Sequence, residues 1–330
     1  MANLQTNYMG LTLKNPIIAS SSPLTSNLDS LKRLEDAGAG AVVIKSIFQE
    51  QVDKEADMTM EMNEAFLTHA DAYGFLKGAS EDHLIDAYLT LIEDAKKSLD
   101  IPVIASLNGS GKGDWIKEYA PRFKVVGADA IEINHYEIGS SRKIDSRTIE
   151  KRYINFAKIA RKEIDLPLSL KIGSNFSSPS WMMHYFDDLK IDSLVLFNKF
   201  YNPDIDIEKM SIKPGIPMSS PSEYYNTLRW IGLMSEELNC DLCANTGIYD
   251  SSTIIKMLLA GASSVELCSV LMKDGVDVIN KFTSEISEWM DKKGFNAIDD
   301  FKGQLAQERM SDPTKWERTQ YVKSLHIKGN

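Results

Sequence analysis

The chain has 330 residues, 43% of them apolar, and a formal net charge of −10 from 37 basic and 47 acidic side chains. This acidic balance argues against nucleic acid or an anionic membrane surface as the main partner. No apolar run is long enough to span a membrane, and the N-terminus has no apolar leader. We therefore expect a cytoplasmic protein without a membrane partner.

The three cysteines are too few for a secreted, disulfide-stapled scaffold. Cys240 and Cys243 are three residues apart, which in a strand would place the two thiols on opposite faces. No second pair completes a zinc site, and the five histidines lack the spacing of a helical zinc motif. We expect buried, inert thiols and no metal.

Short apolar runs alternate with amphipathic patterns along most of the chain. The apolar runs predict β-strands at 17–19, 41–44, 102–106, 130–133, 168–170, 193–197, 241–244 and 264–267. The amphipathic patterns predict helices at 28–37, 84–98, 115–123, 146–163, 180–189, 222–238 and 276–292, and one between Asp250 and Gly261. Apolar and polar residues alternate around Gly10 in residues 4–14, which predicts a hairpin that caps one end of the fold. Eight strands alternating with helices predict an α/β fold, the (β/α)8 TIM barrel, as one domain over 1–330 with its core at about 15–292.

Three stretches break this rhythm. Residues 47–80 are rich in Glu, Asp and Met and predict a long insertion, which is either a lid or subunit contact, or a solvated loop. Residues 200–220 form a second insertion with three prolines. Residues 293–330 are polar and predict a C-terminal helical extension outside the barrel.

Small and polar residues follow the predicted strands, and barrel topology brings the carboxyl ends of all eight strands to one mouth. These candidate site residues are Ala19, Ser20, Ser21, Lys45, Ser46, Asn108, Asn134, His135, Tyr136, Glu137, Lys171, Asn198, Thr246, Gly247, Cys268 and Ser269. The small residues after the last two strands suit a phosphate that binds backbone N–H groups at a helix start. Ordinary tight turns between strand and helix need the same small residues, so both interpretations stay open.

Two lysines at strand ends are the strongest chemical signal. Lys45 and Lys171 end otherwise apolar runs, although a lysine at a barrel rim can also extend into solvent. With the neighbouring amides, the lysines suit a ring that accumulates negative charge, such as a reduced isoalloxazine. The same lysines also suit a Schiff-base nucleophile, as in a class I aldolase barrel. The residues alone do not decide between these chemistries.

Five motifs occur in order at suitable strand ends: N-P-I-I-A-S-S-S-P at 15–23, I-K-S at 44–46, I-E-I-N at 131–134, L-K-I-G at 170–173 and T-G-I at 246–248. Together they resemble the dihydroorotate dehydrogenase family of FMN-dependent barrels, over roughly residues 4–292. Residues 194–206 are similar to a divergent branch described as dihydroorotate dehydrogenase-like. The resemblance implies an FMN enzyme of pyrimidine biosynthesis that oxidises dihydroorotate to orotate, by C–H deprotonation and hydride transfer to flavin N5. It also implies a homodimer.

By position, the resemblance implies a set of contacts to FMN and substrate. Ala19, Ser20 and Ser21 would line the flavin, Lys45 and Ser46 would lie by its ring, and Lys171 would sit at N1/O2. The flavin ring or the substrate would be contacted by Asn108, Asn134 and Asn198. The substrate would also be contacted by Lys45 and Tyr136. Thr246, Gly247, Cys268 and Ser269 would hold the phosphate through backbone N–H groups.

The chain departs from the family pattern after the fourth strand. Where single-subunit members carry a cysteine base in N-x-S-C-P-N, this sequence has Glu137. Glu137 would then be the catalytic base beside Lys45 and Lys171, with Tyr136 or His135 as alternatives. The changed loop leaves open a different cyclic amide, enone or pyrimidine substrate, a flavin-free Schiff-base lyase, and a non-catalytic binding barrel. With no cysteine run for an iron–sulfur cluster, we expect a small-molecule electron acceptor.

Overall fold

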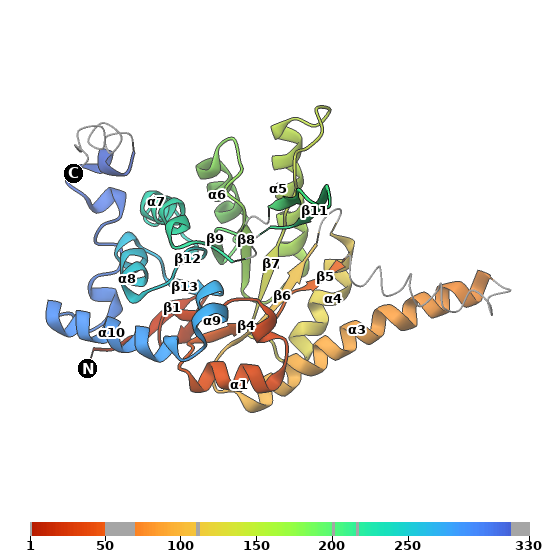
Figure 1. Ribbon diagram of the computed structural model, residues 1–330, viewed down its shortest axis with the longest axis horizontal. Helices are drawn as coiled ribbons and strands as arrows, with labels where there is room; N and C mark the ends of the chain where they lie inside the picture. Colours follow the sequence, from red (N-terminus) through yellow and green to blue (C-terminus); the bar gives the residue numbers. More distant parts are fainter. Residues whose placement is uncertain (1, 50–69, 110–112, 200–201, 216–217, 318–330) are drawn as a thin grey trace.

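The computed structural model describes residues 2–49, 70–109, 113–199, 202–215 and 218–317, and at its centre is a closed barrel of parallel strands (Figure 1). The barrel strands are β3 (Ile17–Ala19), β4 (Ala41–Val43), β6 (Val103–Asn108), β7 (Ala130–Asn134), β8 (Leu168–Ile172), β9 (Ser193–Leu196), β12 (Asp241–Ala244) and β13 (Ser264–Leu267). They lie in the order β4-β3-β13-β12-β9-β8-β7-β6, and a β4–β6 pairing closes the ring. The predicted (β/α)8 TIM barrel is confirmed.

Helices surround the strands on the outside (Figure 1). They are α1 (Leu28–Asp36), α3 (Ala70–Ser98), α4 (Asp114–Val125), α5 (Ser146–Glu163), α6 (Pro179–Asp188), α7 (Tyr224–Met234), α8 (Ser251–Ala260), α9 (Ser269–Asp274) and α10 (Val278–Lys293). A short 3-10 helix, Pro23–Thr25, precedes α1, and another, Pro221–Glu223, precedes α7. A two-residue strand, β5 (Ile47–Phe48), continues the sheet beside β6. The predicted helices are present, with ends that differ by a few residues.

Two helices differ more from the prediction. Helix α3 begins at Ala70, whereas the sequence predicts a start at Leu84. The prediction is shorter because the apolar pattern that indicates a helix covers only the second half of α3. Helix α9 begins directly at Ser269, where the sequence predicts a turn. Its six residues are too few to show helical periodicity, and Gly275, with φ of 87°, separates it from α10.

Side-chain caps fix the helix starts that the sequence predicts. Asp250 accepts a hydrogen bond from the backbone N of Thr253 at 2.7 Å and begins α8, which ends at Gly261 in a left-handed conformation. This is the usual pairing of an acidic N-cap with a C-terminal glycine. The cap orients α8 so that its start faces the carboxyl end of β12.

The N-terminal hairpin closes the other end of the barrel. Its strands are β1 (Thr6–Tyr8) and β2 (Leu11–Leu13), and Tyr8, Met9 and Leu13 pack among side chains of the barrel interior. The Tyr8 hydroxyl accepts a hydrogen bond from Ser193, and the backbone N of Met9 donates to Asp241. The predicted cap is confirmed. It fills the amino-terminal end of the barrel with apolar groups, so polar chemistry is confined to the carboxyl end.

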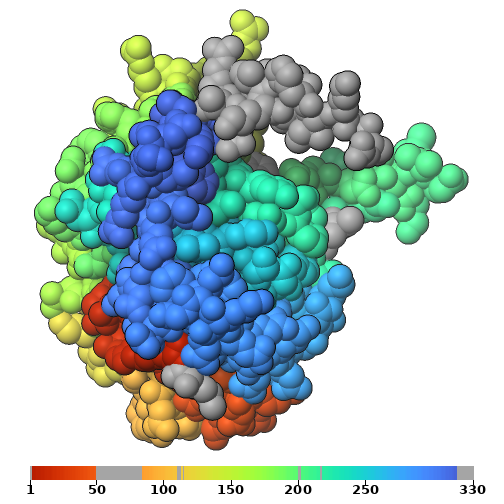
Figure 2. Space-filling view, turned by 90° about the vertical axis from the view of Figure 1, so that its left-hand side faces the viewer, coloured from red at the N-terminus to blue at the C-terminus, as the bar shows by residue number. Residues whose placement is uncertain are grey.

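The insertions and the tail add local structure. The second insertion contains a hairpin of β10 (Pro203–Asp206) and β11 (Ser211–Pro214), which projects from the body with exposed Ile205 and Ile212 (Figure 2). The predicted C-terminal extension consists, in its described part, of 3-10 turns at Ile298–Asp300, Gln307–Arg309 and Pro313–Trp316 rather than a long α-helix. Residues 50–69 and 318–330 lie outside the described residues, so the lid at 47–80 and a single domain over the whole chain stay predictions. None of the described helices combines the length and apolar character needed to cross a membrane.

Candidate active site

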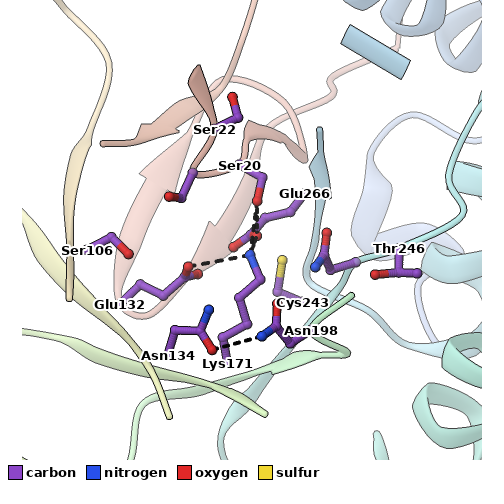
Figure 3. Close-up of polar contacts among 12 residues, drawn as sticks. Ser20, Ser22, Ser106, Glu132, Asn134, Lys171, Asn198, Cys243, Thr246 and Glu266 are labelled. Carbon is purple, nitrogen blue, oxygen red and sulfur yellow. Dashed lines mark hydrogen bonds and ion pairs between the residues drawn. The ribbon is translucent and has the colours of Figure 1, made fainter. Parts of the chain in front are cut away.

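Lys171 is the centre of a buried charged cluster at the carboxyl end of the barrel. Alternation along β8 turns Leu170 and Ile172 outward to the helices, while Lys171 points into the barrel. Its Nζ lies 2.6 Å from Oε2 of Glu266 and 3.5 Å from Oε1 of Glu132 (Figure 3). It also donates a hydrogen bond of 3.0 Å to Oγ of Ser20, which itself donates to Glu266 at 2.7 Å. We call Lys171, Glu132 and Glu266 the buried triad.

The triad is almost completely removed from water: the side chains of Lys171, Glu132 and Glu266 are 6%, 2% and 1% exposed. Burial opposes the charge on Lys171, but the two carboxylates outweigh it and hold the pKa of this lysine well above its usual range. Burial and the neighbouring charge of Glu266 raise the pKa of Glu132 far above its ordinary value. Burial also acts against charge on Glu266, but the lysine and hydrogen bonds to the charged form bring its pKa below the ordinary value. The surroundings therefore favour the protonated form of Glu132 and the charged forms of Glu266 and Lys171.

Amide side chains lie next to the triad. Strand register places Asn134 between Asn108 on β6 and Lys171 on β8. Asn134 is buried and accepts a 3.0 Å hydrogen bond from the side-chain amide of Asn198 (Figure 3). The predicted Asn134, Asn198 and Lys171 thus come together. Their donors and acceptors suit a planar heterocycle with alternating carbonyl and N–H groups.

A small cavity of about 130 Å³ connects the triad with the turns after β12 and β13. The predicted residues that line it are Ser20, Ser21, Lys171, Asn198, Thr246, Gly247, Cys268 and Ser269. The cavity is smaller than the ~300–1,000 Å³ of typical cofactor pockets, so it has room for only one part of a cofactor.

The turn after β12 has an unusual backbone. Thr246 and Gly247 both adopt left-handed conformations, with φ of 74° and 78°. For a β-branched residue such as Thr246 this conformation costs about 1–3 kcal/mol, and such strain concentrates at ligand sites. A Cβ on Gly247 would lie 2.3 Å from the backbone N of Tyr224, so only glycine fits here. The strained turn brings the backbone close to the cavity, as an anion site requires.

Hydroxyl groups complete this end of the cavity. The Ser219 hydroxyl donates to Oγ of Ser269 at 3.1 Å and accepts from the backbone N of Gly247 at 3.2 Å. Ser219 lies in the second insertion, just before the 3-10 helix that begins at Pro221. Together with the two turns, these groups form the end of the cavity that suits a phosphate.

Three predicted residues, one in β3 and two just after β4, lie outside this cavity and the buried triad. Ala19 is fully buried and packs toward the helices. Ser46 is buried and its hydroxyl lies 3.0 Å from that of Ser21 and 2.7 Å from that of Ser106. Lys45 is exposed and borders a separate cavity between α1 and α3. The flavin and substrate contacts of Lys45 stay predictions that need its side chain to turn toward the mouth.

The loop after β7 directs its charged groups toward α5. The carboxylate of Glu137 lies 2.8 Å from Arg152 and 3.5 Å from Nε2 of His135. The His135 ring stacks on Phe156, and burial lowers its pKa, which favours the neutral ring. Tyr136 lies beside Gly173 at the end of β8. The structure therefore does not join Glu137 to the triad, and a base role would require its ion pair to open.

Sequence reasoning missed Glu132, Glu266 and Ser219. A signal for the two carboxylates exists, because each is a single acidic residue inside an apolar strand, in A-I-E-I-N and S-V-E-L. A charged residue in a buried strand needs a partner, and Lys171 on β8 was the available one. Ser219 carries no comparable signal, because a serine in a proline-rich insertion is typical of any loop.

The thiols and possible metal ligands give no further site. Cys243 lies in the barrel interior near Tyr8, at the end closed by the N-terminal hairpin, while Cys240 packs on the outer side of the barrel. The two thiols therefore face apart, as the sequence predicts. All three cysteines are free, and burial raises the pKa of Cys268. Within the described ranges, no group of three or more His, Cys, Asp or Glu side chains is arranged to hold a metal ion.

Comparison with known proteins identifies the family. A family model described as dihydroorotate dehydrogenase matches residues 3–290, nearly the whole barrel. The chain belongs to the dihydroorotate dehydrogenase family. Among its relatives, a protein of Thermoplasma acidophilum is 25% identical over 316 residues, which cover 92% of this chain and 99% of the relative. A protein of Methanothermobacter thermautotrophicus is 24% identical over 91% of this chain and 97% of its own length. Both are named catalytic subunits of dihydroorotate dehydrogenase B (NAD(+)).

Dihydroorotate dehydrogenases use a flavin, and the described residues fit one. The buried lysine and the amides can face an electron-rich ring, while the strained turn and the hydroxyls around Ser219 can hold a phosphate at the other end of the cavity. The chain is therefore an oxidoreductase of this family, acting on a CH–CH donor.

Proposed function

We propose that this protein binds FMN and oxidises dihydroorotate to orotate. The observation that carries the proposal is one cavity lined both by Lys171 and by the small-residue turns after β12 and β13. A flavin mononucleotide has the same two ends, a ring that gains negative charge on reduction and a single phosphate. The names of the relatives, which span almost the same length, support dihydroorotate as the substrate.

The side chains divide between ring, substrate and phosphate. Bound FMN would supply a two-electron acceptor at N5. Lys171 would donate to the ring at N1/O2 from its buried position, and Asn134 with Asn198 would orient the substrate's amides. The backbone N–H groups after β12 and β13 would hold the phosphate, with Thr246 and Gly247 in the strained turn. These assignments support FMN over a larger flavin nucleotide, because they need one phosphate only.

The proton from the substrate carbon needs a base at the mouth. We assign this role to Glu137, the first acidic residue after Asn134 in the loop that follows β7. Its carboxylate is 13% exposed and is held by Arg152, whose own side chain is 47% exposed. An ion pair with an exposed arginine is weak enough to open when substrate binds.

Anaerobic addition of dihydroorotate to the FMN-loaded protein tests this function. Rapid loss of the oxidised-flavin absorbance is expected, and Lys171→Met should slow it. A panel of other cyclic amides, enones and pyrimidines serves as the comparison. Bleaching by one of these but not by dihydroorotate would assign a different substrate, and failure to bind any flavin would refute the proposal.

The electron acceptor is a separate part of the proposal. We propose a small molecule that reoxidises the flavin at the open mouth, since the sequence has three cysteines and no set for an iron–sulfur cluster. NAD⁺ and a soluble quinone can be compared directly as oxidants of the reduced protein. We also propose a homodimer, which sedimentation of the purified protein would test.

A further inference from the structure

The buried triad has one more acidic group than its lysine requires. Glu266 already neutralises Lys171 at 2.6 Å and receives a second hydrogen bond from Ser20. Glu132 lies farther from the ammonium, at 3.5 Å, and to its left in the view of Figure 3, where Ser20 lies above it. A structural ion pair would be complete without Glu132, so the second carboxyl needs an explanation.

The second carboxyl affects the net charge of the triad. Two ionised carboxylates and one ammonium would leave a net negative charge in the barrel interior, where water is excluded. Closely spaced buried carboxyls avoid this by sharing one proton. The shorter distance to Lys171 and the extra donor from Ser20 place the charge on Glu266 and the proton on Glu132. The triad as a whole is then neutral.

We propose that Glu266, through its ion pair with Lys171, sets the positive charge that this lysine presents to the flavin, and that Glu132 is a protonated reserve partner. The proposal rests on the FMN function above. A bare ammonium near the ring would stabilise the reduced, negatively charged flavin and raise its reduction potential. An ammonium already paired with Glu266 does so less, and therefore keeps the potential low. Glu266 acts through Lys171 and is a positioning residue.

The reserve partner makes a distinctive pattern among variants. In Glu266→Gln the lysine loses its nearest anion, and Glu132 gives up its proton to replace it from 3.5 Å. In Glu132→Gln a neutral carboxyl becomes a neutral amide, so the charge at Lys171 hardly changes. Only the double variant leaves the ammonium without an anionic partner in the triad. The effects on the flavin are thus expected to be non-additive.

The experiment measures the flavin reduction potential of the FMN-loaded protein by equilibration with a reference dye. Glu132→Gln should shift the redox equilibrium by less than about threefold, and the double variant by at least about tenfold toward the reduced flavin, or about 30 mV for two electrons. Glu266→Gln should lie between them. If the double variant folds poorly, Glu266→Gln carries the test, because Glu132 remains to pair with the lysine. An unchanged potential in a well-folded Glu266→Gln would overturn the proposal, and so would an unchanged potential in a well-folded double variant.

A second measurement needs no cofactor. Infrared difference spectra of the flavin-free protein should show a protonated-carboxyl band that exchanges in heavy water and is lost in Glu132→Gln. Absence of the band would refute the shared proton even if the potentials shift. If the protein binds no FMN, the proposed function and the effect on the potential fail together, whereas FMN binding with unchanged potentials would refute the role of Glu266 alone.

Discussion

Removal of the triad's cation is the strongest test of its charge state. Lys171→Met keeps most of the side-chain volume but leaves Glu266 and Glu132 without their ammonium. Breaking a buried ion pair by removal of one partner costs about 3–5 kcal/mol near neutral pH. The variant can avoid part of this cost by protonating Glu266, and that response makes its stability depend on pH.

The sign follows from proton binding. A carboxyl whose folded pKa lies above its unfolded value of ~4.3 keeps its proton in the folded state while the unfolded chain has lost it. The unfolding free energy then falls as pH rises, by about 1.4 kcal/mol per pH unit for each such carboxyl. The wild type has one in the triad, Glu132, while Glu266 has a lowered pKa. In Lys171→Met both carboxyls have raised values, so between about pH 5 and pH 7 the variant should lose roughly 3 kcal/mol more than the wild type.

Urea unfolding of the flavin-free protein at several pH values measures this difference. Lys199→Met is the matched control, because Lys199 pairs with Glu223 at a partly exposed site where both side chains are about 30% exposed. The control should lose less than about 1 kcal/mol and keep the pH slope of the wild type. Equal slopes for Lys171→Met and the wild type would refute the triad's charge assignment.

Three further predictions concern other parts of the site and fold. Gly247→Ala should lower stability by about 1–3 kcal/mol and weaken FMN binding, measured by thermal melting and flavin titration, because its Cβ would meet the backbone of Tyr224 at a left-handed position. Asp187→Asn should cost about 1–3 kcal/mol in urea unfolding, since the carboxylate accepts backbone hydrogen bonds from the two residues before β12. Glu137→Gln should slow flavin reduction by about 10²–10⁴-fold, with unchanged FMN affinity, if Glu137 is the base. A normal reduction rate in Glu137→Gln would show that another group is the base. Loss of the ion pair with Arg152 in this variant should change stability by less than about 1 kcal/mol.

The strand and helix order could be predicted because each buried strand is a short apolar run ending in small or polar residues. β3, β12 and β13 begin and end as the sequence predicts. The strand ends alone therefore predict that Lys171, Asn134 and Thr246 lie at the same end of the barrel. The six-residue helix α9 and the 3-10 turns after Gly294 could not be predicted, since they are shorter than the periodicity that reveals a helix.

Side-chain partners were much harder to predict than strand ends. The sequence places Glu137 near the mouth by its position after β7, but the structure shows that its carboxylate pairs with Arg152 on α5. For Glu266 the error is the reverse. Its position within an apolar strand did not suggest a site residue, yet it forms the shortest contact of Lys171 in the triad. Which face of a strand or loop a side chain takes depends on register and packing across the barrel, and these are set by residues distant in sequence.

A single-turnover experiment tests the central claim most directly. The protein, loaded with FMN and freed of oxygen, is mixed with excess dihydroorotate, and both the flavin absorbance and the orotate formed are recorded. We predict full loss of the oxidised-flavin absorbance together with one equivalent of orotate per bound flavin. A flavin that stays oxidised, with no orotate formed, would contradict the assignment of this barrel as a dihydroorotate-oxidising enzyme.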